Sequence, residues 1–263
     1  MSNSSLVSYT KLSPNHSGAR THAIDRITPH CVVGQLTAES ICGCFTSTSV
    51  KASCNYGIGK DGKISLCVDE GNCSWCSSSN ANDQRAVTIE CASDKAEPYA
   101  MTDAVYNSLI NLCTDICKRN GKTKLLWLAD KDKTLAYSPK SDEMVLTVHR
   151  WFKNKSCPGD WLYSRLGDLA TKVTSKLGGT IENSNSSNLN SNSSNLDNYR
   201  VRVTANVLNI RKGAGTNYAV TGAIKDKGVY TIVAESSGTG ATKWGKLKSG
   251  AGWISLDYCT KLG

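Results

Sequence analysis

Short apolar runs and helix-like repeats alternate along the first two thirds of the chain. Residues 25–34 predict a strand, and the short apolar segment 124–129 predicts another. Residues 55–68 predict a hairpin, because Asp61-Gly62 places a two-residue turn between two apolar segments. Strands that alternate with helices in this way are typical of an α/β domain.

Three segments have apolar side chains at helical spacing, namely residues 37–45, 102–121 and 158–179. The second ends on an Asn-Gly pair, which is a common helix C-cap. The third begins at a proline and stops at a Gly-Gly pair, so we predict one unbroken helix from residue 158 onward.

Residues 85–92 alternate between apolar and polar side chains, which predicts a strand with one face in the core. Glu90 is the one charge inside this strand, and its neighbours there are apolar or small. On the pattern alone, two interpretations stay open. Glu90 either faces solvent on the outer side of the strand or is placed there for chemistry.

Residues 178–198 contain the segment NSNSSNL twice in tandem. Asn and Ser side chains compete for backbone hydrogen bonds, and one Leu in seven residues makes no coiled-coil seam. We therefore predict a flexible linker between a domain of residues 1–177 and a domain of residues 199–263. The second domain has short strands bounded by glycine and no helical period, which predicts a small all-β barrel.

Composition and charge narrow the class of protein. With 39% hydrophobic and 20% charged residues, the chain has the composition of an ordinary soluble globular protein. The net charge is +9, and residues 199–263 hold 10 Lys/Arg against 3 Asp/Glu, which is +7. Such a basic module favours an anionic partner, which is nucleic acid, acidic lipid or an anionic cell-wall polymer.

The chain shows no segment that would insert it into a membrane. No apolar run approaches the roughly 18 residues that a membrane helix needs. The first twenty residues also lack the apolar stretch of a secretory signal. We therefore expect the protein to be made and first kept in the cytoplasm, without stable membrane insertion.

Twelve cysteines are many for such a chain. In a reducing compartment the default is free thiols that pack as small apolar groups. Close pairs at 42/44, 73/76 and 113/117 leave metal clips as an alternative. A zinc ribbon that binds nucleic acid needs two Cys-x-x-Cys pairs, and Cys73/Cys76 alone has that spacing, so packing thiols are the favoured interpretation.

The segment HRWFKNKSCPGD, residues 149–160, gathers several reactive side chains. His149 ends an apolar strand-like segment, and Cys157 precedes the proline that starts the last predicted helix. A helix N-terminus is partly positive and lowers the pKa of a thiol. Cys157 and His149 are then suited to bind zinc, and the alternative is a chance grouping in a cysteine-rich chain.

A zinc site needs further groups. The chain has four histidines, His16, His22, His30 and His149. His30 ends a predicted strand and is the preferred third ligand, with His22 as runner-up, although a single strand-end histidine is more often structural. Glu90 is the best candidate for a general base, and Lys155 is either the cation that stabilises an oxyanion or a solvated loop lysine.

These residues resemble the zinc-dependent N-acetylmuramoyl-L-alanine amidases of the amidase-2 type, which are related to phage T7 lysozyme and the peptidoglycan recognition proteins. The family pattern is a histidine, a spacer and then Lys-x-Cys-Pro-Gly. Here it reads His149, Lys155, Cys157, Pro158 and Gly159. ITPHCV is similar to the family's first strand, SCNYGIGKDGKI to its hairpin and AVTIEC to the strand that carries a glutamate.

The resemblance implies an α/β domain in which a central mixed sheet is flanked by helices. It implies Zn²⁺ held by His30, His149 and Cys157, with Glu90 as the base and Lys155 at the oxyanion. Three positions depart from the pattern. Cys54 stands where T7-like members have tyrosine, Asn55 where the hairpin usually has histidine, and Cys76 in place of a frequent histidine.

The segments VLNIRKGAG and GAGW in the second domain resemble bacterial SH3 domains, which bind cell-wall peptides or glycans. The matching residues are Leu208, Asn209, Arg211, Gly213, Gly252 and Trp253.

Taken together, these resemblances predict a monomeric peptidoglycan hydrolase that cuts the bond between N-acetylmuramic acid and L-alanine. The prediction is a phage endolysin that stays in the host cytoplasm until it is released to the wall of a Gram-positive host. The alternatives are a secreted or released autolysin and a non-catalytic peptidoglycan-binding protein, and the zinc cysteine argues against the latter.

Overall fold

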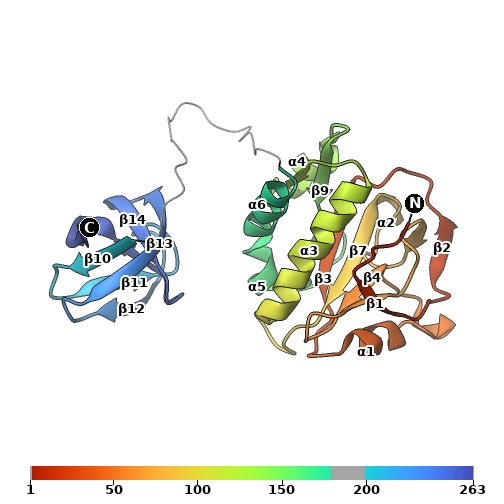
Figure 1. Cartoon of the computed structure of the whole chain (residues 1–263), viewed down its shortest axis with the longest axis horizontal. Helices are drawn as coiled ribbons and strands as arrows, with labels where there is room; N and C mark the ends of the chain where they lie inside the picture. The colour runs from red at the N-terminus through yellow and green to blue at the C-terminus, as the bar shows by residue number, and fades with distance from the viewer. Residues whose placement is uncertain (1, 179–198, 263) are drawn as a thin grey trace. The chain divides into compact units, whose positions relative to one another are not determined.

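The computed structural model describes residues 2–178 and 199–262 (Figure 1). The chain divides into two compact units, Met1–Ser184 and Asn185–Gly263. Apart from Gly178, the predicted linker at 178–198 lies outside the described residues. In the described parts of the chain, no helix is both long and apolar enough to cross a membrane.

The first unit is built on a mixed sheet of seven strands in the order β1-β5-β4-β7-β3-β9-β8. Strand β7 pairs in parallel with β3 and β4, whereas β4 and β5 form the antiparallel hairpin predicted at residues 55–68. The strands are β1 (Val7–Thr10), β3 (Arg26–Cys31), β4 (Tyr56–Ile58), β5 (Ile64–Leu66), β7 (Ala86–Cys91), β8 (Lys124–Leu126) and β9 (Glu143–Leu146). Strands β2 (His16–Ala19) and β6 (Asn72–Ser74) form a separate pair.

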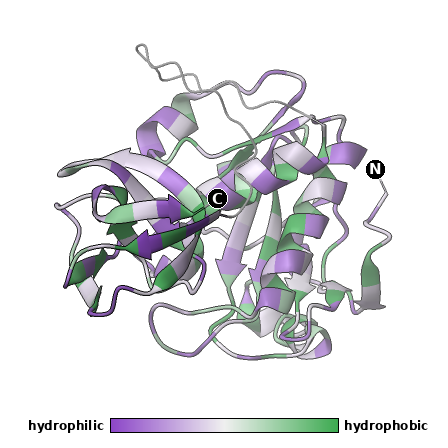
Figure 2. Cartoon of the chain, turned by 60° about the vertical axis from the view of Figure 1, so that its left-hand side comes forward, coloured by the Kyte–Doolittle hydropathy of each residue, from purple (hydrophilic) through white to green (hydrophobic). Residues whose placement is uncertain are grey.

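The helices of this unit are α1 (Ala38–Gly43), α2 (Asn80–Asp83), α3 (Asp103–Arg119), α4 (Lys131–Ala136), α5 (Asp160–Tyr163) and α6 (Leu166–Lys176), with 3-10 turns η1 (Thr48–Val50) and η2 (His149–Trp151). The mixed α/β class is therefore confirmed. Two predicted helices, α1 and α3, begin where expected because Thr37 and Thr102 accept hydrogen bonds from the first turn. The amphipathic pattern of α3 is visible in Figure 2.

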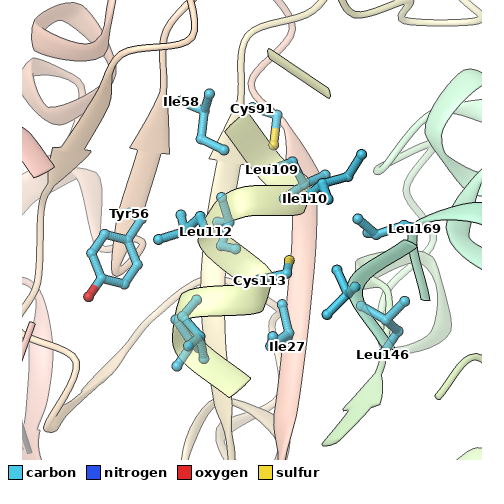
Figure 3. Packing of buried hydrophobic residues seen from close by; sticks show 14 of the residues in the cluster. Ile27, Tyr56, Ile58, Cys91, Leu109, Ile110, Leu112, Cys113, Leu146 and Leu169 are labelled. Carbon is cyan, nitrogen blue, oxygen red and sulfur yellow. The ribbon is translucent and has the colours of Figure 1, made fainter. Parts of the chain in front are cut away.

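One face of the sheet carries the apolar core. Helix α3 lies across it, and Figure 3 shows Leu109 and Leu112 of this helix close to Ile27 and Ile58 of the sheet. All four side chains are fully buried. Burial of each contributes about 1.5–3 kcal/mol, so this layer stabilises the packing of α3 on the sheet.

The opposite face is polar but equally buried, contrary to the half-buried strand predicted at 85–92. Alternation along β3 and β7 places Thr28 and Thr88 on this face, and both are 0% exposed. Asn82 donates to Thr28 Oγ1 at 3.0 Å, and Ser74 shares a hydrogen bond of 2.7 Å with Thr88. Polar side chains that satisfy one another in this way can be buried, which alternation alone does not reveal.

The prediction of one unbroken helix over residues 158–179 is wrong. The segment forms two helices, α5 and α6, and α5 begins only at Asp160. Gly159 precedes it with a φ of +81°, which is not helical. A side chain there would also meet the Pro98 carbonyl oxygen at 2.8 Å, so the position requires glycine. Cys157 is therefore not the N-cap of a helix.

The expectation of free thiols holds for ten cysteines and is wrong for two. Cys42 and Cys67 form a disulfide that joins α1 to the end of β5, so the alternative of a metal clip at 42/44 is wrong as well. Cys113 lies on the buried face of α3 and packs in the core, as expected for a packing thiol. Cys73 is buried in β6 and belongs to no metal-ligating group among the described residues.

The second unit is all-β, as predicted. Its sheet has the order β12-β11-β15-β14-β13-β10-β16 around a small core that includes Val201, Ile232 and Ile254. The strands are β10 (Tyr199–Val203), β11 (Leu208–Arg211), β12 (Val220–Ile224), β13 (Val229–Gly238), β14 (Ala241–Leu247), β15 (Trp253–Ser255) and β16 (Cys259–Leu262), with the turn η3 (Leu256–Tyr258). Its SH3 identity stays a prediction.

Candidate metal centre

The polar face of the sheet ends in a pair of reactive side chains. The parallel ladder between β3 and β7 sets His30 directly beside Glu90. Register partners on neighbouring strands project to the same face, and the two groups lie 4.0 Å apart from Nδ1 to Oε1. The imidazole is 1% exposed and the carboxylate 14%, so the interpretation of Glu90 as a solvated residue is wrong.

His149 and Cys157 reach the same place from a distant part of the chain. Strand β9 ends at Leu146, and the chain passes Thr147 and Val148 before η2 begins at His149. The His149 ring lies edge-on to that of His30, with centroids 5.1 Å apart. Cys157 Sγ lies 3.2 Å from His30 Nδ1.

The three predicted ligands are thus brought together, with one ligand atom from each within 4.8 Å of the other two. Ligand atoms around one tetrahedral zinc ion lie roughly 3.5 Å apart, given the usual metal–ligand bond lengths. The separation of 3.2 Å between Cys157 Sγ and His30 Nδ1 agrees with this spacing. Two imidazoles and one thiol are also a donor set that zinc prefers, so the residues fit the ion.

The electrostatics of the site favour neutral imidazoles, which is the form that binds metals. Burial lowers the pKa of His30, and the nearby His149 lowers it further. Burial also lowers the pKa of His149, with a smaller contribution from the positive charge of Lys155. Ser78 Oγ lies 3.0 Å from His149 Nε2 and holds that ring in place.

The thiol of Cys157 does not have the lowered pKa that was predicted. A hydrogen bond with Cys31 and burial raise its pKa in the metal-free protein. The predicted effect of a helix N-terminus is missing because α5 begins three residues later and has four residues. Ionisation of this thiol therefore has to come from metal binding itself.

Lys155 lies near the site but is exposed, in the loop before Cys157. It lines an open surface depression of about 410 Å³ together with Glu97, Arg150, Asn154, Ser156 and Asp160. Arg150 donates a hydrogen bond to Asp160 Oδ1 at 3.0 Å, so the positive charge of Arg150 is already paired with a carboxylate. Lys155 makes no ion pair among the described residues, so its charge is available to a ligand at this surface.

The runner-up ligand His22 is not brought to the centre. It is exposed, and its Nδ1 lies 2.7 Å from the carbonyl oxygen of the adjacent Ala23. Asn55, one of the departures from the family pattern, is fully buried and has a structural role. Its Nδ2 donates to three backbone carbonyls and its Oδ1 accepts from Thr88 N at 3.1 Å.

The sequence did not reveal which side chains contact the predicted ligands and the predicted base. Ser78 contacts His149, Cys31 contacts Cys157, and Cys76 Sγ lies 3.8 Å from Glu90 Oε1. Cys31 follows His30 directly, but nothing in the pattern distinguishes it from the other buried thiols. Ser78 and Cys76 belong to the segment that covers the polar face, and no periodicity marks it.

We expect Glu90→Gln to stabilise the metal-free protein at alkaline pH. Burial raises the pKa of Glu90 to about 7, against an ordinary value of about 4.3. The folded protein therefore binds this proton more tightly than the unfolded chain does, and the charged carboxylate costs about 3–4 kcal/mol above pH 7. This cost declines as the pH falls from 7 and is gone below about 4.

Urea unfolding of chelator-treated protein, with and without the substitution, checks this expectation. The stabilising effect of Glu90→Gln should be largest at pH 8 and should shrink by about 3–4 kcal/mol toward pH 4. A difference in unfolding free energy that is independent of pH would contradict it.

Comparison with known proteins finds a family match within the first unit. A family profile described as N-acetylmuramoyl-L-alanine amidase, Amidase_2, matches residues 20–160. No curated protein matches the chain significantly.

Several solved structures are similar to the first unit. The structure of PlyL is 13% identical with a TM-score of 0.46, and the match covers 63% of this chain and 95% of that one. A selenomethionine derivative of AmpD is 17% identical with a TM-score of 0.47, covering 64% and 96%. The endolysin amidase LysCS from Clostridium intestinale URNW is 16% identical with a TM-score of 0.39, covering 65% and 97%.

Proposed function

The chain belongs to the N-acetylmuramoyl-L-alanine amidase family Amidase_2, and we propose that it is a zinc-dependent hydrolase of bacterial peptidoglycan. The bond it cuts joins the lactyl group of N-acetylmuramic acid to L-alanine. The observation that carries the proposal is the convergence of His30, His149 and Cys157 beside Glu90. The endolysin role and the host cytoplasm as first location stay predictions.

In this proposal His30, His149 and Cys157 hold the metal. When bound, zinc supplies Lewis-acid activation of the scissile carbonyl and of water. His30 is fixed by its position at the end of β3, and Ser78 orients His149. Strand β3, the turn η2 and the loop before α5 therefore hold the three residues close together before the substrate arrives, which lowers the cost of ordering the site.

Glu90 is the proposed general base. Its carboxylate is nearly buried and has a pKa raised to about 7, close to neutral pH, where a base is most effective. It takes a proton from the attacking water and returns it to the L-alanine nitrogen as that group leaves. Both transfers need a group that binds and releases a proton near pH 7.

Lys155 is the proposed cation at the oxyanion. The positive charge of Lys155 lowers the pKa of the His149 imidazole, which places Lys155 close to the metal centre. A cation beside the carbonyl oxygen favours the negative charge that develops during attack. Its exposed position allows the side chain to move onto the substrate.

The second unit is the proposed wall-binding module of residues 199–263. Gly252 supports the SH3-like assignment, because a side chain there would meet the Arg211 carbonyl oxygen at 2.4 Å. Trp253 is the register partner of Arg211 and of Lys246 on the two neighbouring strands, so the three side chains project to the same face of the sheet. This arrangement and the charge of +7 suit an anionic wall polymer.

An assay on purified cell walls tests the proposed function. The protein should release new L-alanine amino termini, and a chelator should stop the release. Release of reducing sugars without amino termini would indicate a glycosidase and overturn the proposal.

Separating the two units should separate hydrolysis from wall binding. Residues 1–178 alone should hydrolyse soluble muramyl peptides at close to the full-length rate, because the metal centre lies wholly in the first unit. On intact walls this fragment should be slower, since a tethered binding module raises the local enzyme concentration into the millimolar range. Residues 199–263 alone should pellet with walls and release nothing, and failure to pellet at low salt would overturn the targeting role.

A further inference from the structure

The thiol of Cys76 faces the reactive end of the polar sheet face. Cys76 lies two residues beyond β6, and its Sγ is 3.8 Å from Glu90 Oε1. One ligand-type atom from each of His30, Cys76 and Glu90 lies within 4.8 Å of the other two. Neither the proposed zinc ligands nor the proposed base includes this thiol.

The two oxygens of the Glu90 carboxylate have different surroundings. Oε1 faces both the Cys76 thiol and His30 Nδ1. Oε2 is buried and has no hydrogen-bond partner among the described residues. Oε1 therefore lies on the side of the proposed ligands, and Oε2 is shielded from solvent.

The backbone around Cys76 is held firmly in place. Asp83 accepts a hydrogen bond from Cys76 N at 3.0 Å and another from Ser77 N at 3.1 Å. On the other side, Trp75 N donates to Ser53 Oγ at 3.0 Å. The thiol is thus presented to Glu90 by a fixed segment.

We propose that Cys76 is a positioning residue for Glu90. Its S–H donates to Oε1 and sets the rotation of the carboxylate, which keeps Oε1 beside His30 Nδ1, the side from which the attacking water would approach. The inference rests on the proposed role of Glu90 as the base. A thiol is a weak donor, so its loss should lower kcat by about 3- to 10-fold and leave KM unchanged.

Steady-state kinetics on a soluble muramyl peptide test the proposal. Cys76→Ala and Cys76→Val both lack a donor and should show the loss in kcat with unchanged zinc content. Cys76→Ser keeps a donor and should recover part of it. Cys73→Ala is the matched control, because Cys73 is a buried thiol in the same segment that contacts Ser74 and Asn80 instead.

A double-mutant cycle separates this inference from the proposed function. If Cys76 acts through Glu90, Cys76→Ala should have no further effect on the residual rate of Glu90→Gln. An equal loss in both backgrounds, or an unchanged kcat in Cys76→Ala, overturns the positioning role alone. Nearly full activity of Glu90→Gln overturns the role of the base and this inference with it.

Discussion

Cys157→Ser should lose bound zinc and nearly all hydrolytic activity. The thiol lies 3.2 Å from His30 Nδ1 and is the one anionic ligand in the proposed set once its proton is released. A serine hydroxyl is shorter and does not ionise under the same conditions, so two neutral imidazoles would remain to hold the ion. Metal analysis of the purified protein and release of L-alanine amino termini from walls measure the two losses.

Two control variants make this result specific. His22→Ala removes the runner-up histidine, which is exposed, and should leave the zinc content unchanged. Cys44→Ser removes an exposed thiol and should likewise have no effect. A Cys157→Ser protein that keeps stoichiometric zinc would show that the ligand assignment is wrong.

Glu90→Gln should reduce turnover by roughly 10²–10⁴-fold, the usual contribution of general acid–base catalysis. Glutamine has nearly the same size but cannot take a proton from water. Zinc content and wall binding should be preserved, because neither depends on the carboxylate in the proposed site. The measurement is kcat on a soluble muramyl peptide, with wall pelleting and metal analysis alongside.

Glu39→Gln is the matched control for this substitution. Glu39 is an exposed carboxylate in the first turn of α1, outside the proposed site, and its replacement should leave turnover unchanged. A rate for Glu90→Gln within a few-fold of the parent protein would mean that the base lies elsewhere.

The amino-acid sequence by itself determined the main elements and the candidate ligands. Strand and helix patterns depend on residues that are close together in the sequence, and so do local signals such as the Thr37 and Thr102 caps. For that reason β3, the β4–β5 hairpin, α1 and α3 could be predicted within a few positions. The zinc-ligand candidates were recognisable because each lies in a short motif.

The tertiary structure alone decided which distant groups meet. Cys42 pairs with Cys67 across 25 residues, and the Cys76 thiol lies beside Glu90, and neither contact was expected from the sequence. Alternation along β7 showed that Glu90 and the core residues lie on opposite faces. It carried no information about the segment with Ser74, Cys76 and Asn82 that covers the polar face. Periodicity reports the side on which a residue lies, whereas the partner on that side is set by long-range packing.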